Sequence, residues 1–304
     1  MCVLHLWWRW SLRQRFDVVM RDFTCTVLGS GTSAGVPSIG CHCDVCMSDD
    51  PRDTRLRTAA ALRWIDADDH PRVLLIDAGP DLRQQVLAAG VDRCDGILIT
   101  HNHVDHVFGL DEVRRFNVTM RASVTVWAEP HVQQDLRRVY QHIFASEDNV
   151  NPSFVANIKL CDLDPDGVLE LYGLRITPIR MLHGALPILG FRFDAVDAAS
   201  SASPLPLAWC TDVSEMPESA VEQMGGLDTL FLDMLRERPH KTHLNLAEAT
   251  ALATRLEACH TWFVHMGHEV SHSGVSEHLS DGLKLAFDGL ELPFREVVAG
   301  AGTS

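Results

Sequence analysis

Four potential metal ligands fall within six residues of the stretch THNHVDH. His101, His103, Asp105 and His106 follow the apolar run at 96–100, which is typical of a short buried strand. Residues two apart on an extended backbone point to the same side, so His101 and His103 can bind one metal ion. Asp105 and His106 then face a neighbouring position. Imidazole and carboxylate suit zinc, manganese or iron, so the stretch predicts a metal site.

A second cluster of candidate ligands consists of thiols. Cys41, Cys43 and Cys46 have C-x-C-x-x-C spacing within GCHCDVC. Three thiolates are one ligand short of a closed tetrahedral zinc site. The remaining cysteines suggest no disulfide scaffold, because the total of nine is odd and sparse. Cys25 and Cys210 lie in apolar, strand-like runs and are expected to pack in the core. Reduced thiols beside a metal cluster predict a cytoplasmic, metal-binding protein.

The elements that must position these residues alternate along the chain. Strands are predicted at 23–30, 58–65, 72–79, 96–100, 123–129, 174–182, 188–194, 207–212, 227–234 and 261–267. Helices are predicted at 81–90, 109–117, 130–144, 216–226 and 245–258. The small-residue segment 195–207 is expected to form a surface hairpin loop. This order predicts an α/β sandwich of two sheets covered by helices.

The motif and this order of elements resemble the metallo-β-lactamase-fold hydrolases over residues 23–298. The resemblance implies a four-layer αβ/βα sandwich. In that family the loop motif is joined by a histidine, an aspartate and a last histidine, each at a strand end. Here His183 ends ITPIRMLH, Asp212 ends LAWCTD and His265 ends TWFVH. Residues 22–304 are therefore expected to form a single hydrolase domain, with residues 1–21 as a poorly ordered N-terminal extension.

The resemblance further implies a catalytic site with two divalent metal ions, zinc or manganese. The implied ligands divide into a first set, a second set and a bridge, namely His101, His103 and His183, then Asp105, His106 and His265, and finally Asp212. A bridging water or hydroxide completes the site, and Asp105 is also expected to take part in catalysis. Metal binding lowers the pKa of water from ~15.7 toward ~7, which provides a nucleophile at neutral pH. Hydrolysis of a phosphodiester, ester or amide is the expected reaction class.

One branch of this family has a cysteine-rich loop after its first strand. The stretch GSGTSAGVPSIGCHCDVC at 29–46 resembles the loop of phosphodiesterases that act on a phosphoribosyl cyclic phosphate. In that branch a histidine three residues beyond the last catalytic histidine completes a structural zinc site. The resemblance therefore implies that His268 joins the three cysteines, ahead of the nearby His42 and His272. A Cys₃His site is fully coordinated and hence structural.

Other residues are candidates for handling the substrate. His243 precedes a predicted helix, and the resemblance implies that it stabilises or protonates the substrate during phosphodiester cleavage. Arg55 and Arg57 could clamp a phosphate, although a solvated basic pair is equally compatible with the sequence. Asp77 ends a predicted strand and is expected to orient the metal-binding loop or one of its histidines.

Composition narrows the choice of partner. The 26 basic and 41 acidic residues give a formal net charge of −15, which disfavours tight binding to nucleic acid. The apolar N-terminus is interrupted by Arg9, Arg13 and Arg15 and lacks a cleavage motif, so it is interpreted as neither a signal peptide nor a membrane span. A small phosphodiester is the expected substrate, and a homodimer is an assembly that the sequence allows.

Three other functions remain open at the level of sequence. An RNA-processing nuclease related to the enzymes that mature transfer-RNA 3′ ends would share the metal ligands, but it conflicts with the acidic charge. A lactonase or another ester hydrolase would explain neither the cysteine loop nor His243. A catalytically idle scaffold would leave the full ligand set without a role.

Overall fold

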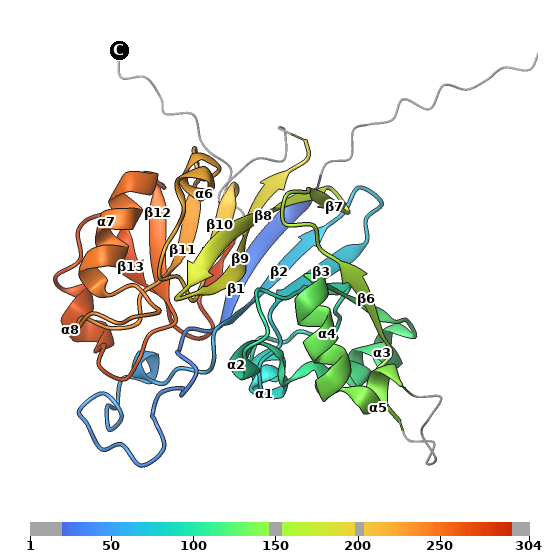
Figure 1. The fold of residues 1–304 in the computed structure, drawn as a ribbon, viewed down its shortest axis with the longest axis horizontal. Helices are drawn as coiled ribbons and strands as arrows, with labels where there is room; N and C mark the ends of the chain where they lie inside the picture. Colours follow the sequence, from blue (N-terminus) through green and yellow to red (C-terminus); the bar gives the residue numbers. More distant parts are fainter. Residues whose placement is uncertain (1–19, 146–153, 198–203, 294–304) are drawn as a thin grey trace, which may run out of the picture.

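The computed structural model describes residues 20–145, 154–197 and 204–293, and these fold into two packed seven-stranded sheets flanked by helices (Figure 1). The predicted extension at 1–21 lies outside them except for Met20 and Arg21, and so does part of the predicted loop at 195–207. In the first sheet the strands follow the order β14 (Glu291–Leu292), β1 (Arg21–Gly29), β2 (Ala59–Ile65), β3 (Pro71–Ile76), β4 (Gly96–Leu98), β5 (Val124–Ala128) and β6 (Ile158–Asp162). In the second the order is β13 (Leu283–Leu285), β12 (His260–Val264), β11 (Thr229–Asp233), β10 (Leu207–Cys210), β9 (Leu186–Ala195), β8 (Leu174–His183) and β7 (Leu169–Leu171).

Alternating side chains build the core between the sheets. In β2, Ala60, Leu62 and Trp64 face the second sheet, whereas Ala59 and Ala61 belong to a separate cluster on the outer face. The second sheet contributes large aromatic side chains to the same central core, including Phe191, Phe193, Trp209 and Phe231. Both faces of each sheet are therefore buried, which explains the almost continuous apolar character of these strands.

Helices cover the two outer faces. The outer cluster of the first sheet packs under α1 (Leu82–Ala88), α2 (Val104–Val107), η2 (Leu110–Val113), α3 (Arg114–Met120), α4 (Pro130–Val139) and α5 (Gln141–Phe144). The outer cluster of the second sheet packs under α6 (Glu218–Glu222), α7 (Leu246–Leu256) and α8 (His272–Ser276), and the short η1 (Pro51–Asp53) lies in the loop after β1. Figure 1 shows the two helical groups on opposite sides of the paired sheets. The predicted four-layer αβ/βα sandwich is confirmed.

Strand direction explains where a site can form. Strands β3 to β6 run parallel in the first sheet, and β10 to β13 run parallel in the second. Ligands in such sheets bind beyond the carboxyl ends of the strands. The HNHVDH loop follows β4, and Asp212 and His265 follow β10 and β12 within two residues. The topology thus directs ligands from both sheets to one edge of the sandwich.

The structure differs from the sequence prediction in a few elements. Strands β6, β7, β13 and β14 and helix α8 were not predicted. The expected single helix at 130–144 is divided into α4 and α5 at Tyr140, where φ is −105° and ψ is 43°. Cys25 and Cys210 are fully buried, which confirms the prediction of core packing. Within the described residues, we find no helix with the length and apolar character needed to cross a bilayer.

Candidate metal centre

The first ligand cluster joins the loop after β4 to the end of β8. His101, His103 and His183 each offer a ligand atom, and these atoms lie within 4.8 Å of one another. The ring centroids of His103 and His183 are 5.1 Å apart although the residues come from different sheets. The three side chains predicted for the first metal are thus brought together, and their role as ligands remains a prediction.

The second cluster contains the remaining four predicted catalytic ligands. Ligand atoms of Asp105, His106, Asp212 and His265 also lie within 4.8 Å of one another, and all four residues are buried. Asp212 lies between the two histidines. Its Oδ2 is 3.2 Å from Nε2 of His106, and its Oδ1 is 3.2 Å from Nε2 of His265. Asp212 also has a ligand atom within 4.8 Å of one on His183, a member of the first set, so it is placed to reach both sets, as the bridging role implied by the resemblance requires.

Hydrogen bonds to one ring nitrogen leave the other free to bind a metal. Thr100 Oγ1 donates to Asp77, so it accepts from Nδ1 of His101 at 2.9 Å. Nδ1 of His106 donates to Asp77 at 2.7 Å, and Nδ1 of His183 donates to the carbonyl of Thr242 at 2.7 Å. Such contacts fix the tautomer and orientation of metal-binding histidines.

Several buried nitrogens in the site have no hydrogen-bond partner. They are Nε2 of His101, Nε2 of His106, and both ring nitrogens of His265. Burying a polar atom without a partner is costly, and four such atoms converge beside two carboxylates. A pair of divalent cations would satisfy the three Nε2 atoms, whereas Nδ1 of His265 faces Asp233, so the residues present fit the metals that the family resemblance implies.

Charge within the second cluster also favours a cation. Burial alone would lower the pKa of His106, but the carboxylates of Asp212 and Asp77 outweigh it and hold that pKa well above its ordinary value. Burial would raise the pKa of Asp212, yet His265 and His106 hold it well below its usual range. The pKa of His265 is raised to about 9, because the surrounding carboxylates outweigh burial. The carboxylates therefore stabilise positive charge at this position.

Three of the eight non-glycine residues with positive φ in the described part of the chain lie at this site. Asp77, Asp212 and His265 have φ values of 63°, 60° and 61°, in the left-handed region that residues other than glycine rarely adopt. Such strain persists only where the surrounding structure enforces it, and it often marks functional sites.

Asp233 is a site residue that the sequence analysis missed. It ends β11 and is fully buried. Its Oδ1 lies 3.2 Å from Nδ1 of His243 and 3.4 Å from Nδ1 of His265, and it accepts the backbone N–H of Asp212 at 3.1 Å. In the sheet, β11 lies between β10 and β12, which precede Asp212 and His265. An aspartate at the end of β11 was therefore the signal that could have identified Asp233. One carboxylate thus orients three functional positions.

His243 lies beside the metal clusters, as the sequence analysis expected of a residue that acts on substrate. Its ring centroid is 4.6 Å from that of His183 and 4.7 Å from that of His265. The side chain is buried, and its Nδ1 contacts Asp233. Because the carboxylate fixes Nδ1 as a donor, Nε2 is the nitrogen left to meet a substrate.

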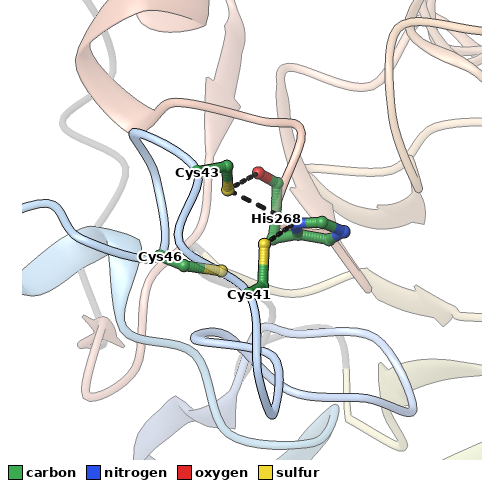
Figure 2. A group of neighbouring side chains, drawn as sticks. All are labelled: Cys41, Cys43, Cys46 and His268. Atoms are coloured by element: carbon green, nitrogen blue, oxygen red, sulfur yellow. Dashed lines mark hydrogen bonds between the residues drawn. The ribbon is translucent and has the colours of Figure 1, made fainter.

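The cysteine cluster forms a separate site. Ligand atoms of Cys41, Cys43, Cys46 and His268 lie within 4.8 Å of one another, and Figure 2 shows these side chains converging from two segments far apart in sequence. The sulfurs of Cys41 and Cys43 are each 3.3 Å from Nδ1 of His268. Two ligands of one tetrahedral zinc are about 3.5 Å apart, given bond lengths near 2.0 and 2.3 Å. The arrangement therefore fits a closed zinc site.

The local environment favours a thiolate in this cluster. Hydrogen bonding, first from the backbone of Cys46 and then from His268, lowers the pKa of Cys43 to about 6.

The competing histidines, His42 and His272, are not part of the cysteine cluster. His42 is exposed, and the backbone N–H of His272 is bound by Asp53.

The two arginines considered as phosphate ligands are engaged elsewhere. The Arg55 side chain is fully buried and bonds to Asp53 and to three backbone carbonyls, so it is neither a solvated basic residue nor free to bind phosphate. Arg57 pairs with Asp81 at 3.1 Å and donates to the carbonyl of Ser33.

Comparisons with known proteins agree with the fold. A family model described as a Beta-lactamase superfamily domain matches residues 72–266. A solved structure of a new diphosphatase from the PhnP family is 37% identical, with a TM-score of 0.79 over 90% of this chain and 98% of that chain. Zinc-bound PqqB from Methylobacterium extorquens has a TM-score of 0.69 at 22% identity, covering 88% of this chain and 99% of that chain, and shows the shared fold alone.

One similar curated protein is named as a transferase and not as a hydrolase. The octanoyltransferase of Porphyromonas gingivalis (strain ATCC BAA-308 / W83) is 34% identical over 269 residues, which is 88% of this chain and 51% of that protein. This chain therefore spans about half the length of that relative.

The fold and the clustered potential ligands are those of the metallo-β-lactamase-type hydrolases as a class. Within that class, this chain belongs to the β-lactamase superfamily and to its PhnP branch.

Proposed function

We propose that this protein is a metal-dependent phosphodiesterase that hydrolyses a small cyclic phosphate or a nucleotide-like phosphodiester. The observation that carries the proposal is the convergence of seven potential ligands with a buried, carboxylate-bound histidine beside them. His101, His103 and His183 would hold one divalent ion, and Asp105, His106 and His265 the other, with Asp212 between them. When bound, the ions would activate water near neutral pH and neutralise charge on the phosphoryl oxygens.

The chain itself would supply the acid. Asp233 accepts a hydrogen bond from Nδ1 of His243, which fixes the tautomer and the orientation of the ring. Nε2 of His243 would then donate its proton to the oxygen that leaves phosphorus. The aromatic stack with His265 holds the ring in place, because the two planes lie within 16° of parallel.

A diphosphate is the second candidate substrate. It is favoured by the likeness to the PhnP-family diphosphatase, and cleavage of a P–O–P bond needs the same activated water and the same acid. Nucleic acid is a weaker candidate because of the net charge of −15. One chain contributes every residue of the proposed site, so a homodimer is not required for it; the homodimer and the cytoplasmic location remain predictions.

A substrate panel tests this proposal. The purified protein would be assayed with Mn²⁺ or Zn²⁺ on a bis-aryl phosphate, cyclic nucleotides, a ribose cyclic phosphate and a nucleoside-linked diphosphate. We expect metal-dependent hydrolysis of at least one phosphodiester, and a preference for the diphosphate would favour the second candidate. Hydrolysis of none of these, together with rapid opening of a lactone, would overturn the proposal.

A further inference from the structure

Arg55 is buried in the loop that follows the cysteine cluster and precedes β2. It is 1% exposed and is one of the largest fully buried side chains among the described residues. Arginine is almost never buried without partners. Its contacts therefore indicate what it holds in place.

Two of the four side-chain hydrogen bonds of Arg55 reach one distant segment, while its Nε donates within the loop, to the carbonyl of Arg52 at 3.2 Å. Nη1 of Arg55 donates to the carbonyl of Gly267 at 3.0 Å, and Nη2 donates to the carbonyl of Val270 at 2.7 Å. Nη2 also donates to Oδ1 of Asp53 at 2.8 Å, and the same carboxylate oxygen accepts the backbone N–H of His272 at 2.8 Å. Arg55 and Asp53 thus bind three backbone groups between 267 and 272.

That segment carries one ligand of each proposed metal site. Gly267 lies between His265, which belongs to the buried catalytic cluster, and His268, which faces the cysteines (Figure 2). The cysteine loop and Arg55 are on the same stretch of chain, so the Arg55–Asp53 pair and the Cys₃His site attach that stretch to 265–272 at two points. The catalytic ligand His265 is strained, with φ of 61°, and depends on such attachments to keep its position.

Stability alone is a weak explanation for the pair. A buried ion pair often contributes no more to stability than apolar residues of the same volume, because desolvation offsets the attraction. Five planar donors in a rigid fork do, however, fix the carbonyls that they bind with high geometric precision.

We propose that Arg55 is a positioning residue that couples the two metal sites, so that zinc at the Cys₃His site raises the affinity of the catalytic cluster for its metals. Coupling of this kind is reciprocal, because binding free energies are linked. The inference rests on the proposed metal sites and not on the proposed substrate.

The test measures metal affinity instead of turnover. Mn²⁺ is the probe, because it prefers imidazole and carboxylate ligands to the thiolates of the cysteine site. Full-length protein that retains one zinc but has lost its catalytic metals would be titrated with Mn²⁺ by calorimetry. Wild type would be compared with Arg55→Met, Arg55→Lys and the matched control Arg52→Gln, whose exposed side chain in the same loop forms an ion pair with Asp50.

We expect Arg55→Met to weaken Mn²⁺ binding about tenfold or more, as is usual when a group that orients metal ligands is lost. Arg52→Gln should match wild type, and Arg55→Lys should fall between the two. Val126→Ala, which opens a cavity in the outer core of the first sheet, controls for destabilisation alone. Mn²⁺ affinity within twofold of wild type in Arg55→Met, or equal weakening in Val126→Ala, would overturn the proposal. If Arg55→Met does not fold, Arg55→Lys decides on the same criterion.

A double-mutant cycle tests whether Arg55 transmits the coupling. Cys43→Ser, which should empty the zinc site, is expected to weaken Mn²⁺ binding in the wild-type background. In the Arg55→Met background the same change should have little further effect. Independent, multiplicative effects of the two substitutions would contradict the assignment.

Discussion

At the scale of single residues, His243 and Asp233 distinguish this site from a simple metal-binding cluster. His243 is buried between His183 and His265. Its Nδ1 contacts the carboxylate of Asp233, which also contacts His265. This arrangement engages Nδ1 of His243 and places its ring beside both proposed metal clusters. A proton donor at that position would act on the leaving oxygen.

The first prediction concerns His243→Ala. We expect kcat to fall about 10²- to 10⁴-fold, the usual contribution of a general acid, while metal content stays unchanged. The loss should be smaller for a p-nitrophenyl ester than for an alkyl ester, because p-nitrophenolate leaves without protonation. His240→Ala is the control. His240 neighbours His243, with 5.2 Å between the ring centroids, but it is exposed to solvent. Near-normal turnover of the alkyl ester by a metal-loaded His243→Ala protein would exclude this role.

At the scale of elements, the loop between β1 and β2 is held at two places. The cysteine site joins it to His268, and Asp288 accepts the backbone N–H groups of Ser30 and Leu56.

The second prediction is that Cys43→Ser removes about one bound zinc per chain, because a tetrahedral site with three ligands binds far more weakly than a closed one. Elemental analysis of the purified variant measures this. Cys94→Ser is a control, since Cys94 is buried in the outer core of the first sheet and far from the site in sequence. Unchanged zinc content in Cys43→Ser would refute the site.

The third prediction concerns pH. Asp288 accepts N–H groups of Ser30 and Leu56, and burial nevertheless raises its pKa to about 6. The folded protein therefore retains a proton that the unfolded chain loses at a lower pH. The stabilisation from that proton is complete below about pH 4 and is lost as the pH rises through 6.

Asp288→Asn cannot titrate, so it isolates this effect. We expect the stability of wild type relative to Asp288→Asn to decrease by up to about 3 kcal/mol between pH 4 and pH 7, from about two pKa units at 1.36 kcal/mol each. Denaturant unfolding of both metal-free proteins measures it. A difference that is flat with pH, or one that grows, would show that the carboxyl is not buried as described.

The sequence predicted those elements whose patterns are strong and local. The β2–β3 hairpin and the buried strands were predictable because apolar runs of strand length are bounded by polar turns. Strand β6 was missed because it is an edge strand with no fully buried residue. The break at Tyr140 was missed because helix periodicity continues across it, and only tertiary packing places the Tyr140 hydroxyl against the carbonyl of Val107.

The sequence likewise predicted those site residues that belong to a local motif or to the family pattern, and missed those whose role depends on tertiary contacts. His101 to His106 form a local motif, and His183, Asp212 and His265 were found through the family resemblance. Asp233 has no local signature, since an aspartate at a strand end is common, and its role depends on three contacts that only the assembled sheet creates. Arg55 was misjudged because its burial depends on carbonyls more than 200 positions away in the chain.

At the scale of the whole molecule, the proposed metals would connect the two halves of the sandwich. Residues 101–106 come from the first sheet, and His183, Asp212 and His265 come from the second. Metal that binds only the folded state stabilises it, by about 4 kcal/mol when present at 1,000 times Kd.

The fourth prediction is that chelation lowers the thermal stability of the protein. We expect EDTA to reduce Tm by about 10 °C, because each kcal/mol is worth about 2–4 °C in a domain of this general size. In Asp212→Ala the shift should be much smaller, since only the cysteine site would still respond. An unchanged Tm in wild type after complete removal of metal would argue against a cross-sheet metal centre.

The central claim is that two separate sets of side chains bind metal, one catalytic and one structural. The most direct measurement is the number of zinc ions per chain, determined by elemental analysis of wild type and Asp212→Ala purified from zinc-supplemented cells. The account predicts about three ions in wild type and about one, held by the cysteines and His268, in the variant. The same count of one or none in both proteins would contradict it.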